Sequence, residues 1–370
     1  MHIGVPKEIK NNEFRVGLTP ESVAELVQFG QTVSVETSAG AGIGASDDDY
    51  RAAGAIIVST AGEIFAAADM IIKVKEPQAA ERAMLREGQI LYTYLHLAPD
   101  LPQTEELMAS KAVCIAYETV TDDLGELPLL KPMSQVAGRL AIQVGATALQ
   151  KTNGGRGTLL GGVPGVAPAK VVIIGGGDVG FNAAQMAVGL QADVTILERS
   201  AVVMEQLSNY FGPKARVIRS TPSVLADLIT TADMVVGAVL IPGAAAPKLI
   251  TRDMLPTMMN GSVLVDVAID QGGCFETSKA TTHADPTYMI DGVVHYCVAN
   301  MPGAVARTST YALNAATIGH AKRIATHGWK EAMRRDPHLL NGLNVCGGKL
   351  TYAAVGEAHG IETVDPQSCL

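Results

Sequence analysis

The sequence predicts an α/β protein with two doubly wound parallel-sheet domains separated by a cleft. Its 370 residues suggest two domains, since most domains have about 100 to 200 residues. Apolar residues make up 48% of the chain and aromatic residues only 4%, which favours aliphatic layers. Strand-like runs also alternate with helical segments along most of the chain, as parallel sheets with crossover helices require.

Net charge and cysteine usage narrow the possible functions. The 28 basic and 37 acidic residues give a net charge of −9, which disfavours non-specific binding to nucleic acid or to anionic membranes. No apolar run reaches the roughly 18 residues of a spanning helix, and the first residues lack a secretory pattern, so we expect a soluble cytoplasmic protein. The five cysteines are scattered without a C-x-x-C pair, which predicts reduced thiols and no metal site.

The clearest functional pattern runs from Lys170 to Glu198 and predicts a strand, a glycine-rich turn, a helix and a second strand. Gly175, Gly177 and Gly180 form G-x-G-x-x-G, in which glycines permit the tight turn, the approach of a pyrophosphate and close helix packing. The helix from about Val179 to Gly189 would offer free amides to the phosphates. The motif also occurs in ordinary glycine-rich turns, but its context favours a Rossmann-like site for a dinucleotide.

Glu198 completes this pattern. It lies 18 residues beyond Gly180, at the predicted end of the second strand. A carboxylate at that position can accept hydrogen bonds from the adenosine ribose hydroxyls. We therefore expect the pair of strands to bind a nicotinamide dinucleotide through phosphate and ribose together.

The first 130 residues predict a second array of strands and helices. Thr19, Pro20 and Glu21 are typical of a helix start, and Gly30 would end that helix. The preceding loop contains several charged residues, among them Arg15. Ligands of open α/β sheets bind beyond the carboxyl ends of the strands, so Arg15 is a candidate ligand-binding residue, although a solvated loop arginine is equally consistent.

Two further candidates follow predicted strands of this array. The run DMIIKVKEP places Lys73 and Lys75 on one side of a strand, and a buried lysine is costly unless it meets an anion. Lys75 is thus a candidate for anion binding, with an ion pair to Glu76 or Glu118 as the structural alternative. His96 follows a strand predicted from Ile90 to Leu95 and is a candidate general acid or base.

The middle of the chain predicts a long helix from Ser134 to Gln150, capped by Ser134, with a hinge near residues 133–139. Later strands at ADMVVGAVL, SVLVDVAID and VVHYCVAN end in loops that carry Asp270, Asn300 and Met301. These residues would face the nicotinamide end of a dinucleotide, although Asp270 also suits a cap of the following turn. From Thr308 the chain is predicted to be helical and to return to the first domain.

The sequence resembles the bacterial L-alanine dehydrogenase family over nearly its whole length. The resemblance depends on IGVPKEIKNNEFRVGLTP, IIKVKEP, LYTYLHLA, IAYETV, PMSQVAGRLA, GGRGTLLGGVPGV, GAVLIPGAAAPKL, VLVDVAIDQGGCFE and VANMPGAVARTST. It implies a discontinuous substrate domain of residues 1–133 plus 308–370, an inserted NAD-binding domain of residues 134–307, and a homohexamer.

The resemblance also implies roles for individual residues. Arg15 and Lys75 would bind the substrate carboxylate, and His96 and Asp270 would be the catalytic pair. The implied NAD contacts are Ser134, Gly175, Gly177, Asp178, Val179, Gly180, Glu198, Ser220, Val239, Leu240, Val267, Asp270, Asn300 and Met301. The sequence departs from the family at Glu198, where aspartate is common, and near Val203 and Met204, where some members have a lysine.

The activity implied is the oxidative deamination of L-alanine by NAD⁺ and water to pyruvate and ammonia, and its reverse, without a metal. Two alternatives stay open. One is a nucleotide-binding subunit of transhydrogenase type, which moves hydride between two nucleotides, and the other is a non-catalytic NAD-binding protein. The combination of Arg15, Lys75, His96 and Asp270 favours a small-acid substrate over both.

Overall fold

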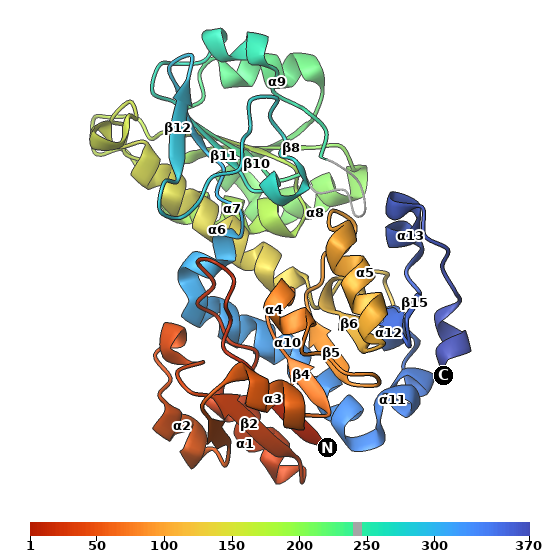
Figure 1. The fold of residues 1–370 in the computed structure, drawn as a ribbon. Helices are drawn as coiled ribbons and strands as arrows, with labels where there is room; N and C mark the ends of the chain where they lie inside the picture. The colour runs from red at the N-terminus through yellow and green to blue at the C-terminus, as the bar shows by residue number, and fades with distance from the viewer. Residues whose placement is uncertain (240–245) are drawn as a thin grey trace. The chain divides into compact units, whose positions relative to one another are not determined.

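The computed structural model describes residues 1–239 and 246–370 of the chain, which divide into two units. The first unit combines Met1–Met133 with Gly303–Leu370, and the second unit is Ser134–Pro302. Figure 1 shows this interleaving, because the first unit contains both the red-to-orange start of the chain and its blue end. Each unit contains one sheet with flanking helices, so the predicted α/β class is confirmed.

The sheet of the first unit has the strand order β15-β14-β6-β5-β4-β1-β2-β3. Six strands are parallel, namely β1 (His2–Val5), β2 (Thr32–Glu36), β3 (Ile56–Val58), β4 (Met70–Ile72), β5 (Ile90–Thr93) and β6 (Val113–Ala116). The C-terminal strands β14 (Leu343–Cys346) and β15 (Lys349–Leu350) add an antiparallel edge, so this sheet is mixed rather than wholly parallel.

The helices of the first unit are mostly short crossovers between these strands. They are α1 (Pro20–Gln28), α2 (Asp47–Ala52), α3 (Ala61–Ala67), α4 (Ala79–Arg82), α5 (Leu101–Ser110), α10 (Ala306–His327), α11 (Trp329–Arg335), α12 (Pro337–Leu340) and α13 (Ala353–His359). The predicted start of α1 is confirmed, because Thr19 accepts a hydrogen bond from the Ser22 amide and Pro20 is the first helical residue.

The sheet of the second unit has the order β12-β13-β11-β10-β7-β8-β9. Its parallel strands are β7 (Lys170–Ile174), β8 (Asp193–Glu198), β9 (Ala215–Arg219), β10 (Met234–Gly237), β11 (Val263–Asp266) and β13 (Val293–Tyr296), and β12 (Thr287–Ile290) is antiparallel. Its crossover helices are α7 (Asp178–Gly189), α8 (Ala201–Phe211) and α9 (Pro222–Ile229), and α6 (Lys131–Ala148) precedes them in the chain.

Both sheets reverse their strand order at one point. In the first sheet, β1 lies between β2 and β4, and in the second sheet β7 lies between β8 and β10. Crossovers on the two sides of such a point run in opposite directions, which leaves a crevice at the carboxyl ends of the two central strands. The loops after β1 and β4, and those after β7 and β10, therefore form the two places where ligands are expected.

Three local predictions were wrong. The helix α6 begins at Lys131, so Ser134 lies in its first turns and does not cap it. The strand β4 ends at Ile72, so Lys73 and Lys75 lie in the loop beyond it, and β5 ends at Thr93 rather than Leu95. The alternating pattern extends both strands too far because it does not show where a strand loses its partner, whereas Ser134 resembles a cap by residue type alone and the helix already begins at Lys131.

Both sheets are covered by aliphatic side chains, as the composition predicts. In the second unit, Val172, Val235 and Leu264 of three adjacent strands pack with Leu225 and Ile229 of α9, and all five are buried. Strands that are apolar on both faces are typical of parallel sheets with helices on each side. Among the described residues, no helix is both long and apolar enough to span a bilayer.

Candidate active site

The loops after three adjacent strands of the first sheet contain the predicted substrate residues. Arg15 lies in the loop after β1, Lys75 in the loop after β4 and His96 in the loop after β5. Since these strands are parallel neighbours, the three loops emerge at one edge of the sheet. Residues distant in sequence thus belong to one sheet edge, beside the point where the strand order reverses, which is where open α/β sheets usually bind their ligands.

Arg15 is not a solvated loop arginine. Its side chain is almost fully buried and makes a two-point ion pair with Glu13, in which Nε donates to Oε1 and Nη2 donates to Oε2, each at 2.6 Å. Burial alone would lower the pKa of the guanidinium, but the hydrogen bonds and charge of Glu13 outweigh burial and raise that pKa. Arg15 therefore stays charged inside the protein.

Helix α10 fixes the loop that contains Arg15. Thr310 accepts a hydrogen bond from the Val16 amide at 3.4 Å, and Asn314 bonds both the Thr19 amide at 2.9 Å and the Gly17 carbonyl at 3.0 Å. Both helix residues are buried. The C-terminal part of the chain thus supports the N-terminal loop directly, within one unit.

The two lysines after β4 differ in their surroundings. Lys73 is completely buried and pairs with Glu8 at 3.1 Å and Glu81 at 2.7 Å. Lys75 is only 9% exposed, yet within the part of the chain that the structure describes its ammonium forms no ion pair or hydrogen bond. A nearly buried ammonium is costly without an anion, so Lys75 fits an anion-binding role.

The structural alternatives for Lys75 apply only in part among the described residues. Burial would raise the pKa of the Glu76 carboxyl, but the charges of Lys75 and Lys10 outweigh burial and lower it, so Glu76 is close enough to interact electrostatically with Lys75. The direct ion pair of Glu76 is with Lys10, and Glu118 accepts hydrogen bonds from the backbone amides of Leu95 and His96. Lys75 thus shares the charge of one carboxylate with a second lysine and forms no direct ion pair with either acid.

The Glu8 carboxylate joins the two loops beside the reversal point. It accepts the Val74 amide at 2.7 Å as well as the Lys73 ammonium. Sequence reasoning missed Glu8, Glu13 and Glu81 as partners of these bases. Their only signal was the density of opposite charges in KEIKNNEFR, which cannot indicate the pairing.

His96 projects from a strained backbone position. Its φ is +49°, a region that residues with a Cβ seldom adopt, and the Glu118 carboxylate stabilises this turn by accepting the His96 amide at 2.6 Å. The imidazole stacks on Tyr94 with ring centroids 5.7 Å apart, and its side chain is 41% exposed. A strained backbone that presents an accessible imidazole is typical of a functional histidine.

The glycine-rich turn of the second unit has the geometry that a pyrophosphate needs. Gly175 has a φ of +100°, and a Cβ on Gly180 would lie 1.8 Å from the Gly175 carbonyl oxygen, so both glycines are structurally required. A Cβ on Gly177 would meet no described protein atom within 4 Å. The space in front of Gly177 is therefore open, as the close approach of a ligand requires.

The N-terminus of α7 also differs from those of the next two helices. Ser200 caps α8 by accepting the Val203 amide, and Thr221 caps α9 by accepting the Val224 amide. The residue at the corresponding position of α7 is Gly177, which has no side chain that could accept such a hydrogen bond. The first amides of α7 thus suit an anion, which would also lie at the positive end of the helix dipole.

Glu198 ends β8 and contacts the glycine-rich turn. One of its carboxylate oxygens accepts the Gly176 amide at 2.7 Å, and the other accepts the amides of Arg199 and Ser200 at 2.6 and 2.8 Å. The carboxylate is thus held beside the turn by backbone groups alone. It keeps further lone pairs for ligand hydroxyls, since an ionised carboxylate accepts about four hydrogen bonds.

The turn-capping role that the sequence allowed for Asp270 belongs to its neighbour Asp266. Asp266, at the end of β11, is buried and accepts the amides of Ala268, Cys274 and Phe275. Burial raises the pKa of Asp266, and this effect outweighs the hydrogen bonds, which lower that pKa. The turn is therefore stabilised by Asp266, while Asp270 is exposed in the following 3₁₀ turn, Ile269–Gln271.

The other predicted NAD contacts follow the strands of the second sheet at their carboxyl ends. Ser220 follows β9 and donates its amide to the Glu198 carbonyl, Val239 follows β10, Val267 follows β11, and Asn300 and Met301 follow β13. Asp178 and Val179 open α7, and Ser134 lies in α6. Leu240 lies outside the described residues. These loops share one sheet edge, whereas His96 and Asp270 belong to different units.

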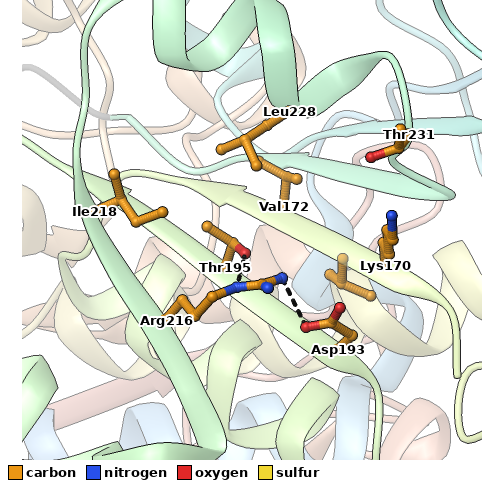
Figure 2. Close-up of a pocket in the computed structure, with 9 residues that line it drawn as sticks. Lys170, Val172, Asp193, Thr195, Arg216, Ile218, Leu228 and Thr231 are labelled. Carbon is orange, nitrogen blue, oxygen red and sulfur yellow. Dashed lines mark hydrogen bonds and ion pairs between the residues drawn. The ribbon is translucent and has the colours of Figure 1, made fainter.

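A hollow elsewhere on the second sheet does not coincide with these residues. It measures about 240 Å³ and is lined by the first residues of β7 and β8, Lys170 and Asp193, together with Thr195, Arg216 and Leu228. Figure 2 shows Arg216 hydrogen-bonded to Thr195 and Asp193 across this hollow. It lies at the amino ends of the strands, opposite the glycine-rich turn, and is therefore not the dinucleotide site.

Comparison with known proteins finds two family models that together match most of the chain, and the match of the second model continues past Pro302, the end of the second unit. The N-terminal domain model of the alanine dehydrogenase/PNT family matches residues 4–137, and the C-terminal domain model matches residues 141–353. Alanine dehydrogenase of Halomonas elongata is 57% identical to this chain over the full length of both.

Solved structures with the same architecture include an L-alanine dehydrogenase and a transhydrogenase of Sinorhizobium meliloti. The first is 49% identical with a TM-score of 0.94 and covers 97% of this chain and 99% of its own. The second is 26% identical with a TM-score of 0.82 and covers 96% and 100%. The chain belongs to the alanine dehydrogenase/PNT family of NAD-dependent oxidoreductases.

Proposed function

We propose that this chain catalyses the NAD-dependent oxidative deamination of L-alanine to pyruvate and ammonia, and the reverse reductive amination. The observation that carries the proposal is the nearly buried Lys75, whose ammonium forms no hydrogen bond or direct ion pair among the described residues, at the same sheet edge as Arg15. Two cations at one sheet edge suit a small carboxylate. The full-length similarity to the Halomonas elongata alanine dehydrogenase supports the choice of substrate.

Arg15 and Lys75 bind and orient the substrate carboxylate in this proposal. A guanidinium offers two parallel donors to a carboxylate, and the lysine adds a second charge. Together they fix the substrate Cα, and such positioning accounts for much of the rate of many enzymes. The proposed carboxylate-binding residues therefore lie in the domain formed by residues 1–133 plus 308–370.

His96 is the proposed proton shuttle. The accessible imidazole accepts a proton from the substrate amine or from water as the imine forms and is hydrolysed, and it returns the proton in the reverse direction. A histidine suits this role because its ordinary pKa lies near neutral pH. Asp270 stabilises the ammonium group and orients the attacking water.

Residues 134–307 are the proposed NAD domain. The glycine-rich turn and the first amides of α7 hold the pyrophosphate, Glu198 binds the adenosine ribose, and the predicted contact residues in the loops after β9, β10, β11 and β13 lie at the same sheet edge. The bound NAD⁺ supplies the hydride acceptor. No metal takes part in this scheme.

One assay tests the activity. Absorbance at 340 nm is followed with L-alanine and NAD⁺, and in reverse with pyruvate, ammonium and NADH. Alanine-dependent formation of NADH is the expected result. Hydride transfer only between two nucleotides would instead favour the transhydrogenase-type function, and NADH binding without either reaction would favour a non-catalytic NAD-binding protein.

We also propose that the chain forms a homohexamer, as the resemblance to the family implies, and that it is a cytoplasmic protein. Light scattering of the purified protein tests the first point, with six times the 38.6 kDa of one chain as the expected mass. Fractionation of the source cells tests the second, with the protein expected in the cytoplasmic fraction.

A further inference from the structure

We propose that Glu13 is a positioning residue that orients Arg15 for the substrate carboxylate. The inference rests on the role proposed above for Arg15. Glu13 itself lies two residues before Arg15, is 6% exposed, and accepts two hydrogen bonds from the guanidinium. It would therefore act on substrate binding through the arginine.

The contact selects one edge of the guanidinium. Glu13 occupies the Nε and Nη2 positions, each at 2.6 Å. A guanidinium can grip a carboxylate with two parallel donors either through Nε and one Nη or through both Nη atoms. Because Glu13 takes the first edge, a substrate carboxylate is received in two-point fashion by the Nη1–Nη2 edge.

The selected edge faces a partner that a carboxylate can replace. Nη1 donates to the thioether sulfur of Met133 at 3.0 Å, and a thioether is a weak acceptor. A substrate carboxylate offers much stronger acceptors to the same donor. On the side of Arg15 that contacts Met133, a bound substrate would thus replace a weak N–H···S hydrogen bond with a strong hydrogen bond to a carboxylate.

The surroundings keep this orientation fixed. The Arg15 backbone amide also donates to Glu13 Oε1, at 3.1 Å, so one carboxylate holds both the main chain and the side chain of the arginine. Thr310 and Asn314 anchor the residues that follow. A guanidinium held from two sides loses little further freedom when it binds a ligand, and such preorganisation favours binding.

The ion pair between Arg15 and Glu13 also gives Arg15 and Lys75 different roles. Arg15 and Glu13 together carry no net charge, so Arg15 contributes direction, whereas Lys75 contributes net positive charge because it shares the single carboxylate of Glu76 with Lys10. Loss of Glu13 should therefore disturb the alignment of the acid. It should leave dinucleotide binding, which uses the other unit, unchanged.

Glu13→Gln tests this inference, because it keeps the size of the side chain and removes one strong acceptor and the charge. The matched control is Glu81→Gln, the same change in a buried carboxylate that pairs with Lys73 at 2.7 Å instead of Arg15. KM for pyruvate, Kd for NADH and the thermal midpoint are measured for both variants and for the parent.

We expect KM for pyruvate to rise by about tenfold or more in Glu13→Gln, since misalignment of a bound reactant is costly. The Kd for NADH should stay within about twofold of the parent, and Glu81→Gln should change the KM for pyruvate much less even if both variants lose similar stability. If Glu13→Gln fails to fold, Glu13→Asp decides, because it keeps the charge but is too short to hold Nε and Nη2 together.

An unchanged KM for pyruvate, or an equal rise in Glu81→Gln, would overturn the positioning role. A lowered KM would also overturn it, because Glu13 would then compete with substrate for the arginine. Arg15→Lys separates this failure from failure of the proposed function. If Arg15→Lys raises the KM for pyruvate and the Glu13 variants do not, only the positioning role fails; if neither change matters, the role of Arg15 fails as well.

Discussion

The two sheets have the same parallel strand order, yet the loops at their reversal points contain different chemistry. After β1 and β4 the chain places buried ions, with Arg15 held by Glu13, and Lys73 held by Glu8 and Glu81. After β7 it places glycines, and the Glu198 carboxylate beside that turn is bound by backbone amides. In the proposed function, the first arrangement recognises its ligand with side chains and the second with the main chain.

This difference suits ligands of different size. A small acid offers few atoms, so its recognition depends on strong, directed charges. A dinucleotide is long, and backbone amides and a helix terminus can bind its pyrophosphate without any cationic side chain. The same strand order therefore supports two kinds of site, because the fold determines where a ligand binds and the loops determine which ligand.

The largest expected effect concerns His96 in the first unit. His96→Asn removes the imidazole, while asparagine tolerates the positive φ of this position better than alanine does. We predict a loss of kcat of about 10²-fold or more, the usual range for a positioned acid or base. Steady-state kinetics measure the loss, and an unaltered Kd for NADH serves as the control. Near-normal turnover would make His96 a structural residue.

Asp270→Asn extends the comparison to the second unit. The change is nearly isosteric, and the exposed side chain does not stabilise the turn, which Asp266 does. We predict that kcat falls by about 10²-fold while the thermal midpoint stays the same. Asp266→Asn is the contrasting variant and should lose stability, because Asp266 is buried among backbone amides. Full activity of Asp270→Asn would exclude its proposed role.

Cofactor choice tests whether Glu198 faces the ribose. Its carboxylate would oppose the 2′-phosphate of NADP, whereas it accepts hydrogen bonds from the hydroxyls of NAD. We predict that NAD is preferred by about a hundredfold in kcat/KM, equivalent to about 3 kcal/mol. Arg199 could reverse this preference if it turned towards the phosphate, but consecutive strand residues point to opposite faces. Comparable efficiencies with both cofactors would contradict the placement of Glu198.

The glycines of the turn separate a structural from a ligand-binding requirement. Gly180→Ala should destabilise the protein by about 1–3 kcal/mol or more, because the new Cβ would lie 1.8 Å from the Gly175 oxygen. Gly177→Ala meets no described protein atom and should cost at most about 1 kcal/mol through the helix cap. Thermal unfolding of both variants checks this order, and equal losses would mean that Gly177 is also structural.

The sequence predicted the strands and the glycine-rich turn and indicated Arg15, Lys75 and His96 as candidates, because these features depend on local patterns. It could not identify the partners of the bases. Glu8 and Lys73 are 65 residues apart, and their pairing depends on β1 and β4 lying side by side. The same limit explains why the sequence could not show which of Asp266 and Asp270 stabilises the turn. Both carboxylates lie at or beyond the end of one strand, and only the folded turn distinguishes them.

The most direct test of the central comparison measures how two variants bind two ligands, pyruvate and NADH. Arg15→Lys alters the first unit and Gly177→Ala the second, and each is assayed for the KM of pyruvate and the Kd of NADH. Lysine keeps the charge of Arg15 but lacks its planar pair of donors. We predict that Arg15→Lys raises the KM of pyruvate by about tenfold or more with little change in NADH binding, and that Gly177→Ala weakens NADH binding by about tenfold with a smaller effect on pyruvate. If Arg15→Lys impaired NADH binding as strongly as pyruvate binding, or left pyruvate unaffected, the assignment of one ligand to each sheet edge would be wrong.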